Sequence, residues 1–331
     1  MKLKKFPFLY ALFLIVVLSF WFVFMFQNNL FYLFKEKVAV FSTMIFGSFI
    51  AGSSPEGSAS IAYPIFTLYL NIEPKIASNF AFAIQSIGMT AASLLILNMK
   101  MKIDWQYVKY VIIGGLPGLV FGTYQIVPLI SPPLAKLFFV SLWLSFGIIL
   151  WRHNQMKHKI KFEFLQQLKS SDIGLLIIFG FIGGIISSIF GTGINIFTFC
   201  LMITYYKIDE KIATPSSILI MTIETLFGIF LHTNLVNDFK KESFEMWLVC
   251  VPVVVFFAPL GSFVMNKMSS HLIAKFLSII LFIQFFGAII VIRPSFLLSI
   301  ISVAVILFGF LIFNYITQLG DIRFYGKKSN P

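Results

Sequence analysis

Residues 47–62 read GSFIAGSSPEGSASIA, and residues 183–198 read GGIISSIFGTGINIFT. These two stretches interrupt the apolar segments 38–70 and 173–206 in the same way, each with a glycine cluster near its middle. Clusters of Gly and Pro end helices, and non-helical backbone at membrane depth is tolerated only where protein or a water-filled cavity covers it. We therefore expect each segment to be a broken, re-entrant helical hairpin.

The composition of the whole chain places these hairpins in a membrane. Of its 331 residues, 59% are hydrophobic and 11% are charged, whereas soluble domains have about 45–50% and about 25%. Apolar runs close to the ~20 residues that cross ~30 Å of hydrocarbon recur along the chain. They predict full spans near residues 8–26, 75–98, 108–128, 133–151, 211–233, 246–265, 272–292 and 295–317.

The two hairpins begin two related halves. Residues 71–78 read NIEPKIAS and align with residues 207–214, KIDEKIAT, and the same offset places Gly57 on Gly193. Such internal similarity indicates a duplication. The organisation that we expect is an extra N-terminal transmembrane helix in residues 1–37, a first repeat in 38–151, a basic cytoplasmic linker in 152–171, a second repeat in 172–293, and a C-terminal transmembrane helix with a basic tail in 294–331.

The distribution of positive charge predicts the orientation of the halves. Lys and Arg concentrate on the cytoplasmic side of membrane proteins. With the basic linker inside, two hairpins place most of the 25 Lys and Arg in the cytoplasm, whereas two single crossings divide them almost evenly. We therefore expect an all-α polytopic protein of the plasma (inner) membrane, with two inverted repeats, each a Gly-broken hairpin plus three transmembrane helices, and with both termini cytoplasmic.

The two glycine breaks are the candidate substrate site. A helix that begins inside the membrane presents unpaired N–H groups and a partial positive charge, which together favour an anion. Small and hydroxyl-bearing residues surround both breaks and the start of the helix after each hairpin. The substrate-binding candidates are Ser53, Ser54, Gly57, Ser58, Ser60, Asn79, Gln85, Gly191, Thr192, Gly193, Asn195, Thr214, Ser216 and Ser217. The alternative for any single hydroxyl is a bond to its own preceding turn or to a neighbouring helix.

Two carboxyl groups lie within apolar surroundings. Glu56 is at the first break and Glu224 is in the middle of the span 211–233. Ionisable residues at membrane depth are costly and are usually functional, and desolvation favours the neutral form of a carboxyl group. We expect both to take part in proton coupling. The alternatives are that Glu56 caps its hairpin or faces water, and that Glu224 is a structural hydrogen-bonding residue.

No cofactor or metal is expected. The four histidines lie at span ends or in loops without a partner at metal-ligand spacing, and Cys200 and Cys250 lie in apolar runs. The net charge of +12 comes from Lys and Arg scattered among loops, so no nucleic-acid partner is expected. The partners expected are a small anionic substrate, membrane lipid and, in a homo-oligomer, further copies of the chain.

The chain resembles the TauE/SafE family of sulfite-exporter-type permeases. The second half carries the resemblance in Gly183-Gly184, in Gly191-Thr192-Gly193 and in the run from Ala213 to Ser217. In the first half Gly57 and Pro64 are similar to the family's glycine cluster and proline, whereas Phe80-Ala81 stands where the Thr/Ser pair would be. The resemblance covers about residues 40–292. It implies transport of small sulfur-containing or carboxylate anions such as sulfite, sulfoacetate or thiosulfate.

Together these features predict a secondary transporter rather than an enzyme. Inverted repeats with broken helices are the architecture of secondary transporters, which bind substrate near the midplane. Two alternatives stay open. An intramembrane enzyme would need a catalytic constellation that the sequence does not offer, and a non-transporting scaffold or assembly factor would not need two polar breaks.

Overall fold

The computed structural model describes residues 7–130, 132–155, 161–166 and 168–325, and the side chain of Ser60 also lies outside what it describes. Over these residues the chain is almost wholly helical, without a strand. The N-terminal lysines, part of the basic linker and the basic tail fall outside the described residues. The helices are α1 (Phe8–Gln27), η1 (Leu30–Tyr32), α2 (Leu33–Glu36), α3 (Val38–Ser53), α4 (Ala59–Pro64), η2 (Ile65–Tyr69), α5 (Pro74–Asn98), α6 (Trp105–Phe121), η3 (Gly122–Ile126), η4 (Val127–Leu129), α7 (Pro132–Gln155), α8 (Ser170–Phe190), α9 (Ile194–Thr204), α10 (Glu210–Phe230), η5 (Leu231–Leu235), α11 (Lys241–Lys267), α12 (Ser270–Ile292) and α13 (Phe296–Tyr325).

The expected all-α polytopic membrane fold is confirmed. Among the described residues, eight helices are long and apolar enough to cross a membrane: α1, α5, α6 extended to Leu129, α8, α10 extended to Leu235, α11, α12 and α13. Seven of these match predicted full spans, and α7 forms a helix over the eighth predicted span. The eighth long helix, α8, is the first arm of the second hairpin. The short helices η1 and α2 were not predicted.

Both interruptions end helices where the glycine clusters predicted. The arm α3 ends at Ser53 and α4 begins at Ala59, while α8 ends at Phe190 and α9 begins at Ile194. The second break uses Gly191 with φ of 74° and Gly193 with φ of 154°, which L side chains rarely adopt. Glycine therefore allows the chain to leave α8 and start α9 within three residues.

The two ends of each hairpin lie at the same end of a neighbouring helix or close to each other. For the second hairpin, the Tyr206 hydroxyl after α9 lies 3.4 Å from Asp172 Oδ1 in the first turn of α8. For the first hairpin, Lys37 before α3 pairs with Glu245, and Glu73 after the hairpin pairs with Lys240, so both ends meet the start of α11. These contacts fit two hairpins and not two single crossings.

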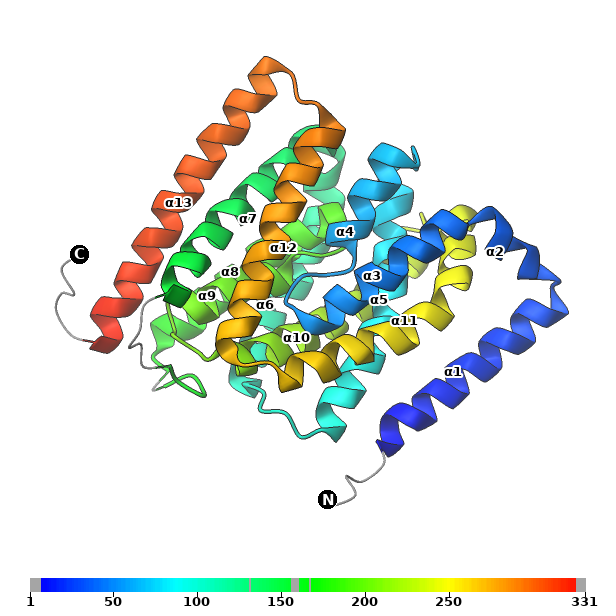
Figure 1. The fold of residues 1–331 in the computed structure, drawn as a ribbon, viewed down its shortest axis with the longest axis horizontal. Coiled ribbons are helices and arrows are strands. Elements are labelled where there is room, and N and C mark those ends of the chain that lie inside the picture. Colours follow the sequence, from blue (N-terminus) through cyan, green and yellow to red (C-terminus); the bar gives the residue numbers. More distant parts are fainter. Residues whose placement is uncertain (1–6, 131, 156–160, 167, 326–331) are drawn as a thin grey trace.

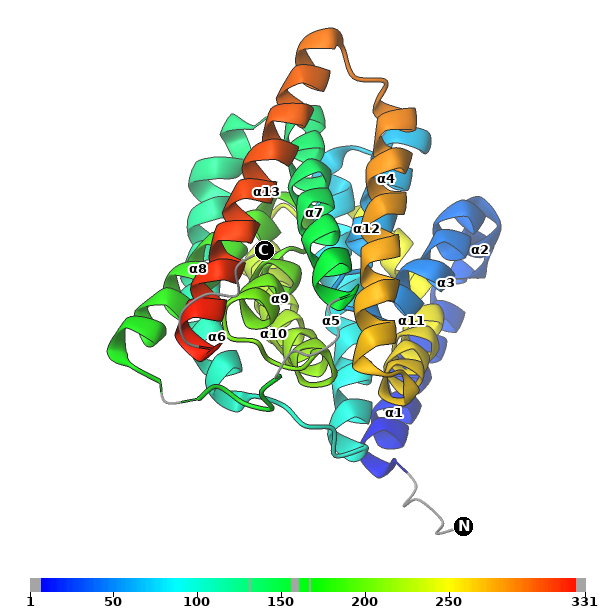
Figure 2. The same cartoon turned by 60° about the vertical axis from the view of Figure 1, so that its left-hand side comes forward.

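The first arm of each hairpin packs against a helix of the other half (Figures 1 and 2). The arm α3 lies along α11, and the arm α8 lies along α6. Glycines permit backbone contact at both places: a Cβ at Gly52 would lie 1.8 Å from the Ala258 carbonyl oxygen, and one at Gly114 would lie 1.9 Å from that of Ile177. The helices α6 and α11 hold equivalent places in the two predicted repeats, so the packing of each first arm on the other half supports the duplication. The inverted orientation of the repeats remains a prediction.

The two extra helices lie at opposite edges of the bundle in Figure 1. At its C-terminal end α13 is held to the second hairpin, since Arg323 Nη2 lies 2.8 Å from Asp172 Oδ2. The buried Lys207 Nζ reaches Asp321 Oδ1 at 2.8 Å and the Thr317 carbonyl oxygen at 3.1 Å. At the other edge, α1 packs against α5 and α11.

Candidate functional site

The two helix breaks are in direct contact with each other. The side-chain amide of Asn195, at the start of α9, donates a hydrogen bond of 2.6 Å to the Pro55 carbonyl oxygen in the first break. A Cβ at Gly57 would lie 2.0 Å from Thr192 Oγ1 in the second break. Only a residue without a side chain allows this approach. The geometry brings together Gly57, Thr192 and Asn195, which the sequence had placed in one site.

Gln85 of α5 joins the same contact. Its Nε2 donates to the Gly191 carbonyl oxygen at 2.8 Å and to that of Ala81 at 3.0 Å. Its Oε1 would lie 2.5 Å from a Cβ at Gly57 and has no hydrogen-bond partner among the described residues. Gln85 is buried. An acceptor therefore stands unused beside both breaks.

The start of α9 provides backbone donors at the same point. The Ile194 amide donates to Ser187 Oγ at 2.9 Å, and the Gly193 amide donates to Asn195 Oδ1 at 3.2 Å. Among the described residues, the next two amides in α9, those of Asn195 and Ile196, have no acceptor. These are the orphan N–H groups of a helix N-terminus. They lie in a buried region whose side-chain donors are amides and hydroxyls.

Glu224 of α10 is connected to the start of α9 through one hydroxyl group. Ser187 Oγ donates to Glu224 Oε2 at 3.0 Å while accepting from the Ile194 amide. The Glu224 side chain is fully buried, and its Oε1 has no hydrogen-bond partner among the described residues. A change in the protonation of this carboxyl group would therefore alter the hydrogen bonding at the start of α9.

Glu56 lies in the first break and is also fully buried, so it does not face water. Gln284 Nε2 of α12 donates to Glu56 Oε2 at 3.0 Å, and the Glu56 amide donates to Ser54 Oγ at 3.2 Å. The carboxylate is thus held by a side chain of the second half.

Several predicted hydroxyls bond locally instead of facing the contact between the breaks. Ser53 and Ser54 donate back to the Ile50 carbonyl oxygen at 3.3 Å and 2.9 Å. In the second half, Ser217 donates to the Thr214 carbonyl oxygen at 2.7 Å. Local bonds of this kind are the ordinary behaviour of Ser in apolar helices.

The other predicted hydroxyls differ in their partners. Ser216 donates to the Ile212 carbonyl oxygen at 2.7 Å and accepts from the Asp104 amide at 2.9 Å, at the start of α6. Ser58 is buried at the start of α4. Thr214 is fully buried, and its Oγ1 has no partner among the described residues. Thr214 thus keeps an unused polar atom among the described residues.

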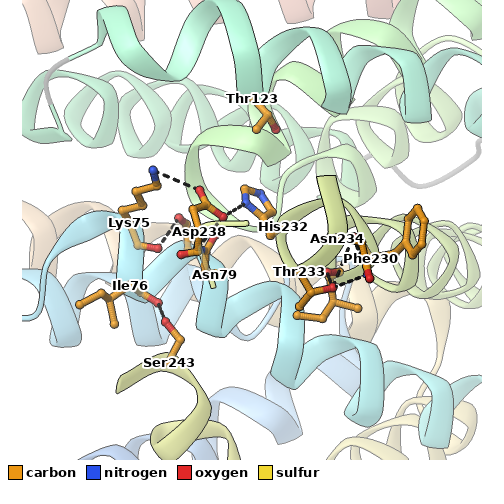
Figure 3. A network of polar contacts seen from close by, with 12 residues as sticks. Lys75, Ile76, Asn79, Thr123, Phe230, His232, Thr233, Asn234, Asp238 and Ser243 are labelled. Atoms are coloured by element: carbon orange, nitrogen blue, oxygen red, sulfur yellow. Dashed lines mark hydrogen bonds and ion pairs between the residues drawn. The ribbon is translucent and has the colours of Figure 1, made fainter. Parts of the chain in front are cut away.

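Asn79 belongs to a separate network (Figure 3). Its Nδ2 donates to the Asp238 carbonyl oxygen at 2.9 Å and to Asp238 Oδ1 at 3.2 Å. The same carboxylate pairs with Lys75 at 3.1 Å and with His232 Nδ1 at 2.8 Å. Burial alone would raise the pKa of Asp238, but the hydrogen bond from His232 and the Lys75 charge lower it below the ordinary value. The cluster fastens the segment before α11 to the start of α5.

Four residues at or beside the breaks were missed by the sequence analysis. Ser187 and Gln284 are polar residues within apolar runs, which is a usable signal of function at membrane depth. The Pro55 carbonyl and Met221, whose sulfur lies 3.0 Å from Asn195 Nδ2, leave no such signal. A backbone acceptor or a thioether cannot be recognised from residue type alone.

Comparison with known proteins agrees with this architecture. The model of the family described as "Sulfite exporter TauE/SafE" matches residues 40–288. A protein of Methanocaldococcus jannaschii named as a probable membrane transporter protein is 33% identical over 130 residues, which cover 37% of this chain and 45% of that relative. The match thus spans less than half of the relative's length, and no solved structure matches the chain. Since the family model covers most of the residues, including both broken hairpins, the chain belongs to the sulfite exporter TauE/SafE family.

Proposed function

We propose that this protein is a secondary transporter of a small anion and binds it between the two helix breaks. The observation that carries the proposal is the contact of the two breaks, through Asn195 with Pro55 and Gly57 with Thr192. Broken helices at a repeat interface are where secondary transporters hold their substrates.

The chemistry of the contact region fits an anion. The amides of Asn195 and Ile196, which have no acceptor among the described residues, and the positive end of the α9 dipole favour negative charge. Thr192 adds a hydroxyl group beside them, and the glycines permit close approach to the backbone. Family membership supports sulfur-containing oxyanions or organosulfonates such as sulfite, sulfoacetate or thiosulfate as the substrate class.

The buried carboxyl groups support coupling to protons. Glu224 is linked to the start of α9 through Ser187, and Glu56 lies in the first break. A neutral carboxyl group does not repel an anion, whereas an ionised one does. Loss of a proton after the two breaks separate would therefore favour release of the substrate.

The orientation in the membrane completes the proposal. The repeats 38–151 and 172–293 are inverted copies, and both termini lie in the cytoplasm of a cell whose plasma or inner membrane holds the protein. The support is the excess of Lys and Arg on that side and the return of each hairpin to its starting side.

Flux measurement in proteoliposomes tests this function. The purified chain should move radiolabelled sulfite across the bilayer at a rate well above that of protein-free vesicles, and unlabelled sulfoacetate or thiosulfate should compete. Recovery of the label as unchanged sulfite would exclude a chemical conversion. Flux equal to that of empty vesicles for all three anions would contradict the proposal and favour a scaffold.

A further inference from the structure

The helix α11 contains two prolines in its interior, Pro252 and Pro259. Proline has no backbone N–H, so it leaves the carbonyl group four residues earlier without its intrahelical partner. In α11 these carbonyls are those of Leu248 and Val255. An unsatisfied carbonyl group in hydrocarbon is costly, because no water is present to replace the missing donor.

The extra N-terminal helix α1 supplies a donor to each of these two carbonyls. Trp21 Nε1 donates to the Leu248 carbonyl oxygen at 2.7 Å, and the Tyr10 hydroxyl donates to that of Val255 at 2.8 Å. Both donors come from one helix, and both acceptors are the ones that the prolines leave free. An apolar helix that only packed against α11 would need neither the indole N–H of Trp21 nor the hydroxyl group of Tyr10.

Near and after Pro259, α11 contacts the C-terminal end of α3. The Ala258 carbonyl oxygen would lie 1.8 Å from a Cβ at Gly52, and Ser262 Oγ donates to the Gly52 carbonyl oxygen at 2.8 Å. Residue 52 lies one turn before Glu56 and Gly57 in the first break. The course of α11 through its prolines therefore sets where the first break begins.

We propose that α1 is a positioning helix, in which Trp21 and Tyr10 complete the hydrogen bonding of α11 at its two prolines and thereby fix the first break. The helix lies outside the matched family region, residues 40–288. Its link to substrate binding rests on the proposed function, whereas its link to the position of α3 does not.

The test uses variants that remove a donor with little change of volume. Trp21→Phe and Tyr10→Phe, alone and together, should speed hydrogen exchange at the backbone of residues 50–57 and lower the unfolding temperature. Trp105→Phe is the matched control, since Trp105 is 57% exposed and donates no side-chain hydrogen bond among the described residues. In sulfite flux, the double variant should raise the half-saturating concentration several-fold, with a smaller change in maximal rate.

A double-mutant cycle makes the test specific. Pro252→Ala restores an N–H that can bond to the Leu248 carbonyl oxygen, so Trp21→Phe should have little effect on exchange at residues 50–57 in that background. Pro259→Ala should suppress the effect of Tyr10→Phe in the same way. Equal effects of the donor variants in the proline and alanine backgrounds would overturn the proposal, as would unchanged exchange at residues 50–57. Because exchange needs no substrate, it decides the matter even if the wild type transports no sulfite.

Discussion

Asn195 of the second break donates its side-chain amide to the carbonyl group of Pro55 in the first break, at 2.6 Å. The two residues are distant in the sequence and belong to different predicted repeats. Their bond links the short helix α9 to the turn between α3 and α4, with Gly57 and Thr192 in contact beside it. Any movement that separates the halves to admit a substrate must therefore lengthen or break this bond.

Gly57→Ala should impair transport strongly. The new Cβ would lie 2.0 Å from Thr192 Oγ1 and 2.5 Å from Gln85 Oε1, so the two breaks must move apart or these side chains must leave their positions. Overpacking of this kind costs about 1–3 kcal/mol. Sulfite flux should fall several-fold. Gly287→Ala is the control, because nothing lies within 4 Å of a Cβ there, and equal flux in the two variants would remove Gly57 from the site.

Cysteine labelling should place both ends of the first hairpin on one face of the membrane. Cysteines introduced at Glu36 and at Ile72 lie just before α3 and just after the hairpin. The native Cys200 and Cys250 are buried and should react slowly. An impermeant thiol reagent added to intact cells should label both positions from outside. Labelling from opposite faces would contradict the inverted arrangement of the repeats.

Asp238→Asn should loosen the segment before α11 and change its response to acid. The carboxylate accepts from Asn79 and His232 and pairs with Lys75. Burial raises its pKa, but His232 and Lys75 outweigh this effect and hold the pKa below the ordinary value. A carboxyl group with a lowered pKa stabilises the fold above the unfolded-state value of about 3.9, and this contribution is lost as pH falls through the folded-state value. Removing it should cost about 1–3 kcal/mol at neutral pH.

The unfolding temperature of the wild type should accordingly fall below about pH 4. The Asp238→Asn variant should have a lower unfolding temperature than the wild type at pH 7. Its unfolding temperature should fall less than that of the wild type on acidification. Glu242→Gln is a suitable control, since Glu242 forms no ion pair among the described residues. Curves for Asp238→Asn that coincide with the wild type at all pH values would show that the cluster in Figure 3 does not stabilise the fold.

Much of the fold could be predicted because its signals are local. Helix ends follow from Gly and Pro clusters such as 52–57 and 191–193, and the long helices follow from the length of the apolar runs. The pairing of α3 with α11 could not be predicted, because it depends on which surfaces fit together. The backbone contact of Gly52 with Ala258 is a tertiary property that no local pattern encodes.

The candidate site was predictable in part for a similar reason. Gly57, Thr192 and Asn195 stand in the two glycine clusters, Gln85 is a polar residue within an apolar span, and the structure brings the four together. Asn79 is a polar residue of the same span as Gln85, yet its side chain turns to Asp238. Residue type and spacing indicate that a side chain is polar and on which helix it lies, but the partner that it meets is set by packing.

Glu224→Gln is the most direct test of proton coupling. The carboxyl group is fully buried, one oxygen accepts from Ser187, and the other has no hydrogen-bond partner among the described residues. Glutamine keeps the shape and the acceptor for Ser187 and fixes the neutral state. The variant should therefore still bind substrate and exchange labelled for unlabelled sulfite across the membrane. It should lose the acceleration of net flux that an imposed pH gradient gives the wild type.

The Ser187→Ala variant separates coupling from local structure. It removes the hydroxyl group that links Glu224 to the Ile194 amide but leaves an ionisable carboxyl group in place. We expect weaker substrate binding with pH-driven flux retained, the opposite pattern to that of Glu224→Gln. If Glu224→Gln instead keeps full pH-driven transport, Glu224 is a structural hydrogen-bonding residue. Glu56→Gln, which changes the other buried carboxyl group of the breaks, would then decide whether Glu56 carries the proton.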